Sequence, residues 1–161
     1  MKSEVTLIPM TREICHRIYA CWENDPAICA DPARFRPYVY TRAAVDRYYD
    51  ERQDDTRLML AVLLRDEPIG EIQLKRIDRQ KQICTLSIHL VNDRVKGHGY
   101  GTQAVRRALQ YAFAKLGMRE VLADAVIRNT RSQHVLEKTG FVRTGEDADF
   151  VYYRALRPDD V

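Results

Sequence analysis

The sequence has few of the features that mark a specialised chain. Its 161 residues contain no apolar run near the roughly 18 residues that a membrane-spanning helix needs, and no internal repeat. The four cysteines include no Cys-x-x-Cys pair, so the usual zinc-site pattern is absent; they are Cys15, Cys21, Cys29 and Cys84. The net charge of +3 is too small to indicate the dense basic patch of a nucleic-acid binder. We therefore expect no metal, nucleic-acid or membrane partner.

What is present is the composition of one folded domain. Hydrophobic residues make up 45% of the chain and charged residues 30%, which are ordinary values for a globular protein. A chain of this length can bury a real core, and no low-complexity linker divides it. We expect a single domain over residues 1–161. The first residues lack the apolar segment of a secretory leader, so we expect a cytoplasmic protein with reduced thiols.

Hydrophobic periodicity predicts alternating strands and helices. Thr11 and Thr41 can each cap a helix, and the proline-containing stretch between the first two helices is expected to be irregular. Gly70, near the start of the third strand, permits a bulge or a close backbone approach. The expected strands are residues 5–9, 58–65, 69–77, 82–91, 121–127, 141–144 and 150–156; the expected helices are residues 11–23, a segment from 41, 101–116 (with Gly117 as C-cap) and 129–139. The order predicts an α/β fold with a mixed sheet and helices on both faces.

Three glycines alternate in the turn that joins the expected strand 82–91 to the following helix. Gly97, Gly99 and Gly101 remove Cβ atoms from one side of the turn, so backbone N–H groups can point into a common hollow at the helix N-terminus. This spacing departs from the G-x-G-x-x-G of a dinucleotide fold, and the turn lacks the G-K-[S/T] of a P-loop. The turn predicts a site for another diphosphate ligand, and a purely structural glycine turn remains an alternative.

Two segments together resemble the GNAT N-acetyltransferases. Residues 91–102, Val-Asn-Asp-Arg-Val-Lys-Gly-His-Gly-Tyr-Gly-Thr, are similar to the family's pyrophosphate motif, with Lys96 at the position of its Arg or Gln. Residues 129–141 are similar to its Asn-x-x-Ser/Ala … Glu-Lys-x-Gly-Phe segment. The resemblance covers about residues 57–156. Residues 22–26, Trp-Glu-Asn-Asp-Pro, resemble the RimJ/RimL-like subgroup that acetylates ribosomal-protein N-termini.

The resemblance implies a fold and a donor. The fold is a GNAT-like, mostly antiparallel sheet of six to seven strands with helices on both faces. The donor is acetyl-CoA, used as a co-substrate without a metal. Its pantetheine arm would pair with the backbone of one strand and contact Asn129, for which a helix N-cap is the alternative. The implied CoA-binding residues are His89, Leu90, Val91, Lys96, Gly97, His98, Gly99, Tyr100, Gly101, Thr102, Asn129 and Ser132.

The resemblance leaves the catalytic acid and base open. Many family members carry a Tyr acid on the last long helix, where this chain has Leu136; Ser132 matches the Ser that lies near the thiol in the ribosomal-protein subgroup. The family's strand glutamate maps near Thr85. Glu71 and His89 are the candidate bases, against the alternatives of an exposed sheet carboxylate and a strand histidine with satisfied hydrogen bonds.

The resemblance also implies a reaction and leaves the acceptor open. A neutral amine would attack the thioester directly. The acceptor is a primary amine of a small molecule or a protein N-terminus, and the protein is a monomer or homodimer. A non-catalytic acyl-CoA-binding module and a binder of another diphosphate are the alternatives. We expect an acidic, aromatic acceptor rim drawn from the first two helices and the last hairpin: Tyr38, Tyr40, Tyr48, Tyr49, Asp50, Glu51, Asp147 and Asp149.

Overall fold

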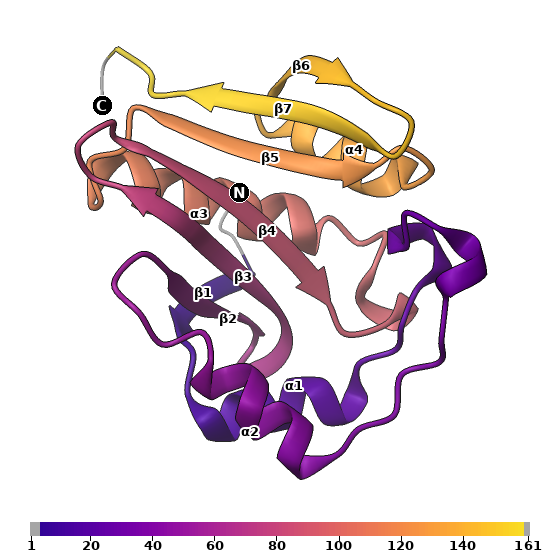
Figure 1. The fold of residues 1–161 in the computed structure, drawn as a ribbon. Helices are drawn as coiled ribbons and strands as arrows, with labels where there is room; N and C mark the ends of the chain where they lie inside the picture. The colour runs from indigo at the N-terminus through magenta and orange to yellow at the C-terminus, as the bar shows by residue number, and fades with distance from the viewer. Residues whose placement is uncertain (1–3, 160–161) are drawn as a thin grey trace.

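A single mixed sheet organises the chain. The computed structural model describes residues 4–159, so residues 1–3 and 160–161 of the expected domain lie outside the described residues. Within that range the sheet has seven strands in the order β1-β2-β3-β4-β5-β7-β6 (Figure 1). Every neighbouring pair is antiparallel except β4 and β5. The strands are β1 (Val5–Pro9), β2 (Leu58–Leu64), β3 (Glu67–Asp78), β4 (Ile83–Leu90), β5 (Glu120–Val126), β6 (Val142–Glu146) and β7 (Phe150–Leu156).

The helices begin at the caps that the sequence predicts. The hydroxyl of Thr11 accepts a hydrogen bond from the backbone N–H of Ile14, and that of Thr41 accepts one from Ala44. The third helix differs from the expected 101–116: it ends two residues earlier, and Gly117, with φ of 71°, reverses the chain beyond its end. The helices are α1 (Arg12–Cys21), α2 (Arg42–Asp50), α3 (Tyr100–Ala114) and α4 (Thr130–Lys138), with short 3₁₀ turns at Pro26–Ile28, Pro32–Arg34 and Asp93–Val95.

Helices cover both faces of the sheet. On β2, Leu60 and Val62 join the core that α3 and α4 cover, whereas Met59 and Ala61 join a second core beneath α1 and α2. Alternate residues of one strand are therefore buried on opposite faces, which explains why this strand reads as a continuous apolar run. The predicted layered fold and the predicted order of strands and helices along the chain are confirmed.

The parallel strands β4 and β5 separate toward one end of the sheet. They pair only at Ile83 to Thr85, opposite Glu120 to Leu122. Beyond Thr85 the two strands diverge, as the widening gap between their ribbons shows (Figure 1). The edge of β4 from Leu86 to Leu90 is therefore without a neighbouring strand on that side within the described chain. An edge of this kind can accept an extended ligand as an added strand.

Gly70 allows β3 to approach β4 closely at the diverging end. A Cβ built on Gly70 would lie 2.4 Å from the carbonyl oxygen of His89 and 2.9 Å from Cδ2 of Leu90. The register between β2 and β3 also shifts beside this residue, between Val62 and Leu63. The expected bulge and close approach are both confirmed. The glycine thereby fixes the position of the last residues of β4.

No helix in the described range 4–159 combines the length and apolar character needed to cross a lipid bilayer.

Candidate active site

A cavity of about 400 Å³ opens where β4 and β5 diverge. Its walls come from the end of β4, the glycine turn, the N-terminus of α4 and the segment after α1. The lining residues are Trp22, Glu23, Asp25, Ala27, Ile28, Ile88, His89, Leu90, Asp93, Lys96, Gly101, Arg128, Asn129, Thr130, Arg131, Ser132 and Val135. We call this hollow the donor cavity.

The glycine turn adopts backbone conformations that favour glycine. Gly97 and Gly99 have φ of 78° and 83°, a region that side chains with a Cβ rarely adopt. Among residues 4–159, the N–H groups of positions 97–102 find no hydrogen-bond acceptor. They are available to an anion at the start of α3. Of the predicted turn residues, Lys96 and Gly101 line the donor cavity, whereas Gly97, His98, Gly99, Tyr100 and Thr102 do not.

Cations gather at one end of the donor cavity. Nζ of Lys96 lies 3.3 Å from Oδ2 of Asp25 and 3.6 Å from Oδ1 of Asp93. Arg131 also pairs with Asp93 at 3.6 Å, and Arg128 donates to the backbone carbonyls of Pro26 and Cys29. Hydrogen bonding to the N–H of Ala27, aided by Lys96, lowers the pKa of Asp25. Lys96 is thus held by two carboxylates, one of which belongs to the segment after α1.

The end of β4 contributes two of its three predicted residues. His89 and Leu90 line the donor cavity. Val91 does not: it is buried, its N–H donates to the carbonyl of Ile69, and its own carbonyl accepts a hydrogen bond from the N–H of Glu23. Both backbone groups of Val91 are therefore engaged within the protein, which leaves the residues before it as the free part of the edge.

Helix α4 presents one face to the donor cavity. Asn129, Ser132 and Val135, three residues apart, all line it. Oδ1 of Asn129 caps the helix by accepting a hydrogen bond from the N–H of Ser132 at 3.1 Å, so the N-cap alternative is confirmed. The cap uses only the oxygen; the amide nitrogen has no acceptor within the described chain. Leu136 points into the core, with 3% of its surface exposed.

A second cavity of about 340 Å³ adjoins the first. It lies between α1, α2 and the segment that links them, and we call it the aromatic cavity. Its lining residues are Tyr19, Trp22, Ile28, Tyr38, Ala44, Val45, Tyr48 and His89. Three of them, Trp22, Ile28 and His89, also line the donor cavity. The two cavities therefore share one wall, and His89 is the titratable side chain in it.

The environment of His89 suits a proton acceptor. Within residues 4–159 its ring has no hydrogen-bond partner, although it packs edge-on against Trp22 at 6.3 Å between centroids. Burial lowers the pKa of the imidazole, and the carboxylate of Glu71 partly opposes that shift. The imidazole is therefore mainly neutral at pH 7, with nitrogen lone-pair capacity facing the shared wall.

Glu71 is buried, so the alternative of an exposed sheet carboxylate is wrong. It has 0% of its surface exposed because helices cover both faces of β3. Its Oε1 accepts hydrogen bonds from the hydroxyls of Tyr19 (2.8 Å) and Tyr48 (2.5 Å) and from the amide of Gln73 (3.1 Å), while Oε2 is buried and has no partner among residues 4–159. Glu71 lines neither cavity. It lies beside His89 in the register of β3 and β4.

Comparison with known proteins identifies the family of this chain. Residues 4–142 match the family described as the acetyltransferase (GNAT) domain. The chain belongs to the GNAT acetyltransferase family. Among curated proteins it is similar to YjcK of Bacillus subtilis, named a probable N-acetyltransferase (28% identical over 65% of this chain and 59% of that one), and to YdaF of the same organism, named as a candidate ribosomal N-acetyltransferase (28% identical over 56% and 49%). The match thus spans about half to three fifths of the length of these curated relatives.

The fold of solved GNAT structures agrees with that of this chain. A spermidine N-acetyltransferase from Vibrio cholerae, solved in complex with CoA and spermine, superposes with a TM-score of 0.79 and 21% identity over 96% of each chain. At this identity the likeness shows the fold alone. The expected GNAT fold is confirmed, and the similarity to YdaF agrees with the resemblance to the ribosomal-protein subgroup.

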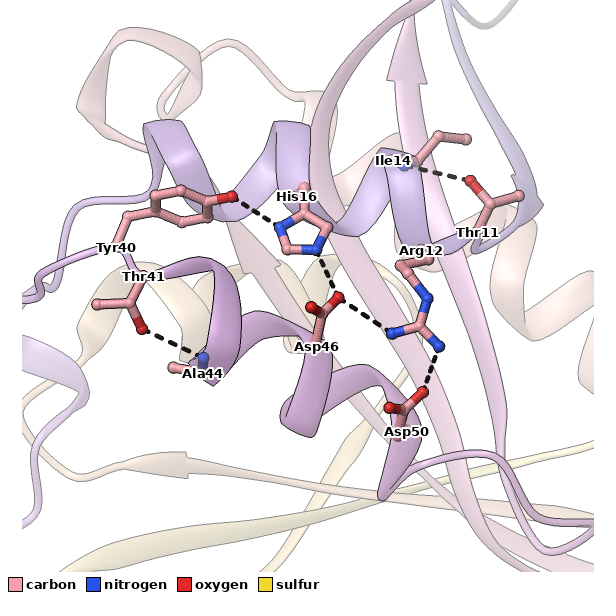
Figure 2. A network of polar contacts seen from close by, with 9 residues as sticks. All are labelled: Thr11, Arg12, Ile14, His16, Tyr40, Thr41, Ala44, Asp46 and Asp50. Atoms are coloured by element: carbon pink, nitrogen blue, oxygen red, sulfur yellow. Dashed lines mark hydrogen bonds and ion pairs between the residues drawn. The ribbon is translucent and has the colours of Figure 1, made fainter.

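Most residues of the expected acidic, aromatic rim do not line the aromatic cavity of this GNAT domain. Of its eight residues, only Tyr38 and Tyr48 line the aromatic cavity. Arg12 pairs with Asp46 and Asp50 of α2, and His16 bonds Asp46 at 2.8 Å and the hydroxyl of Tyr40 at 2.7 Å (Figure 2). This cluster ties α1 to α2 and engages Asp50, one of the carboxylates that were expected to face an acceptor. Asp147 instead accepts hydrogen bonds within the β6–β7 turn.

Sequence reasoning missed several wall residues. The helix expected to reach residue 23 ends at Cys21, so Trp22 leaves its stripe and lines both cavities. Asp25 and Ile28 come from the irregular segment that follows, where no periodicity assigns a face. Arg131 lies on the exposed side of the α4 start and carries no local signal. The spacing of three from Asn129 to Val135 could have revealed the cavity-facing stripe of α4.

Among residues 4–159, no group of three His, Cys, Asp or Glu side chains is arranged to hold a metal ion.

Proposed function

We propose that this chain transfers an acetyl group from acetyl-CoA to a primary amine of a small molecule or a protein N-terminus. The observation that carries the proposal is the shared wall of the two cavities. A thioester in the donor cavity and an amine in the aromatic cavity would meet beside His89. Family membership supports the same reaction.

The donor would enter along the open edge of β4. The pantetheine arm can pair with the backbone near His89 and Leu90 as an added strand, and the amide nitrogen of Asn129 can donate to it. The diphosphate would lie against the free N–H groups of residues 97–102, at the positive end of α3, with Lys96 adding charge. This assignment gives a role to each side of the donor cavity.

The aromatic cavity would hold the amine, which must be neutral to attack. His89 accepts a proton from the acceptor nitrogen, and the nitrogen forms a bond to the thioester carbonyl carbon. The carbon–sulfur bond then breaks, and the sulfur takes up a proton to leave as the CoA thiol. Ser132, half-buried in the donor cavity, is the hydroxyl placed to donate toward that sulfur. The proton that His89 takes from the nitrogen balances the proton that Ser132 gives to the sulfur, so the products of the neutral amine are an amide and the CoA thiol.

Glu71 has a supporting role in this proposal. Because it lines neither cavity, it is not the group that touches substrate. It holds the hydroxyls of Tyr19 and Tyr48 and places a negative charge behind His89. Glu71 is therefore a positioning residue. A monomer or homodimer in the cytoplasm remains our expectation for the protein as a whole.

The test is thiol release from acetyl-CoA across a panel of primary amines. Exposed Cys21 reacts with thiol reagents, so each reaction needs a blank without amine. The variant His89→Gln should lower kcat by about 10²-fold or more. The matched control is His134→Gln, because His134 is exposed on α4 and lines neither cavity. Binding of CoA without thiol release for any amine would refute transfer and favour a CoA-binding module.

A further inference from the structure

The walls of the aromatic cavity carry almost no charge. Four of its eight lining residues are aromatic, Tyr19, Trp22, Tyr38 and Tyr48, and three more are aliphatic. No carboxylate and no Lys or Arg is among the lining residues; His89 is at the shared wall. A cavity with such walls binds apolar groups and excludes unpaired charge.

The aromatic rings support one another. Trp22 and Tyr38 pack edge-to-face with centroids 4.9 Å apart and planes at 83°, and Tyr19 and Tyr48 do so at 5.1 Å and 61°. Tyr19 also contacts Trp22 and Tyr38, at 6.0 Å and 6.5 Å. Since Glu71 anchors two of these phenols, the walls are held in place before a ligand arrives. A preorganised apolar wall binds without paying for ordering of its side chains.

Charged side chains of α1 and α2 near the aromatic cavity already have partners within the protein. Asp46 and Asp50 pair with Arg12 and His16 in the cluster that joins α1 to α2 (Figure 2). The guanidinium carbon of Arg52 lies 3.8 Å from the centroid of the Tyr48 ring, so a positive charge already sits behind this wall. The buried carboxylate of Glu71 lies behind Tyr19 and Tyr48, accepts hydrogen bonds from their hydroxyls and does not line the cavity. A second ammonium group on a ligand would therefore contact no carboxylate in the cavity, and the positive charge of Arg52 would oppose it.

Accepting the acetyl transfer proposed above, we infer that the acceptor is a primary amine borne two or three bonds from an aromatic or branched apolar group, with no second positive charge. The apolar group fills the aromatic cavity, and the nitrogen reaches the shared wall at His89. The low polarity of the cavity also favours loss of the ammonium proton, which yields the nucleophilic neutral amine.

A matched pair of acceptors tests this assignment. 3-Methylbutylamine and 1,4-diaminobutane have the same number of heavy atoms and differ mainly in a branched methyl end against a second amine. We expect kcat/KM for thiol release to be at least about tenfold higher for the branched amine, because burying an unpaired ammonium costs more than about 1.4 kcal/mol. 2-Phenylethylamine should behave like 3-methylbutylamine, and spermidine like the diamine.

A variant pair makes the test independent of the absolute rate. Ala44 lines the aromatic cavity on α2, whereas its neighbour Ala43 does not, and both are exposed enough to accept a carboxylate. Ala44→Asp should shift the ratio of kcat/KM values toward the diamine by about tenfold, the scale of one new ion pair in a partly dry site. Ala43→Asp should leave the ratio unchanged.

Two outcomes overturn the inference in different ways. Equal or faster turnover of the diamine or spermidine by the unaltered protein would refute an apolar acceptor while leaving acetyl transfer intact. Thiol release from no amine at all would refute transfer itself, and the acceptor class with it. A further arm compares a short peptide with N-terminal Phe with 2-phenylethylamine. Preference for the peptide would assign the apolar amine to a protein N-terminus, and the reverse order would assign it to a small molecule.

Discussion

The ion pair between Lys96 and Asp25 predicts that the ligand-free donor cavity opposes its own ligand. The pair lies where a diphosphate is proposed to bind, so a bound diphosphate must compete with the Asp25 carboxylate for Lys96 and is repelled by it. Asp25→Asn removes that charge. It also preserves the cap on the Pro26–Ile28 turn, because an asparagine oxygen can still accept the hydrogen bond from the N–H of Ala27.

The size of the effect follows from the geometry. Two unit charges 3.3 Å apart attract by about 5 kcal/mol at an effective dielectric of about 20 and by about 1.3 kcal/mol in bulk water. The side chains of Lys96 and Asp25 are 14% and 32% exposed, so water screens the pair, and Asp93 still holds Lys96 in the variant. We expect a gain near the lower limit, about 1 kcal/mol, which lowers the Kd for CoA about fivefold.

Calorimetric titration with CoA measures this change directly. The fluorescence of Trp22, the single tryptophan of the chain, gives a second readout because Trp22 lines the donor cavity. Asp31→Asn is the matched control, because Asp31 caps the next 3₁₀ turn in the same way but forms its ion pair with Arg34. The advantage of Asp25→Asn over the control should shrink as salt is added.

The result that would refute the reasoning is weaker CoA binding by Asp25→Asn with unchanged binding by Asp31→Asn. Asp25 would then act by holding its segment over the donor cavity, and its charge would not compete with the ligand. Equal binding by both variants would show that the ion pair does not oppose the diphosphate.

Three further predictions concern the end of β4. The kcat/KM of the unaltered protein should fall as pH decreases through the depressed pKa of His89, because protonation removes the base. Dividing its pH profile by that of His89→Gln separates this fall from the ionisation of the amine. Identical profiles would exclude His89 as the base. Glu71→Gln should move this fall to lower pH, since the carboxylate raises the pKa of His89; a fall that stays in place would show that Glu71 acts only through Tyr19 and Tyr48. Gly70→Ala should lower the free energy of unfolding by about 2 kcal/mol or more, because the new Cβ would meet the His89 carbonyl at 2.4 Å; an unchanged urea midpoint would contradict that close approach.

The sequence predicted much of the fold because local signals agree with the global structure. The alternation of strands, the two threonine caps and the glycine turn before the third helix all depend on neighbouring residues. The end of the helix before Gly117 was less well placed, since the last turn of a helix is fixed by tertiary packing as well as by its cap.

Part of the proposed CoA site was predictable for the same reason. Of the expected residues, His89, Leu90, Lys96, Gly101, Asn129 and Ser132 line the donor cavity, whereas most of the aromatic cavity was not predicted. The glycine turn and the residues from Asn129 to Ser132 lie in two short segments whose spacing carries information. The aromatic cavity draws single residues from positions 19 to 89, and its lack of charge depends on pairs such as Arg12 with Asp46, which are 34 residues apart. The burial of Glu71 likewise depends on α1 and α2 covering a strand whose other face is also covered.

The wall shared by the donor and aromatic cavities has a consequence for inhibitor design. Trp22, Ile28 and His89 line both hollows, so under the proposed function one molecule would reach from one to the other. A CoA thioether joined through a short acetyl bridge to an apolar amine would bring the second group to its cavity at millimolar effective concentration, with an affinity well above that of either half. The bridge length that gives the highest affinity would then report the distance between the sulfur and the nitrogen.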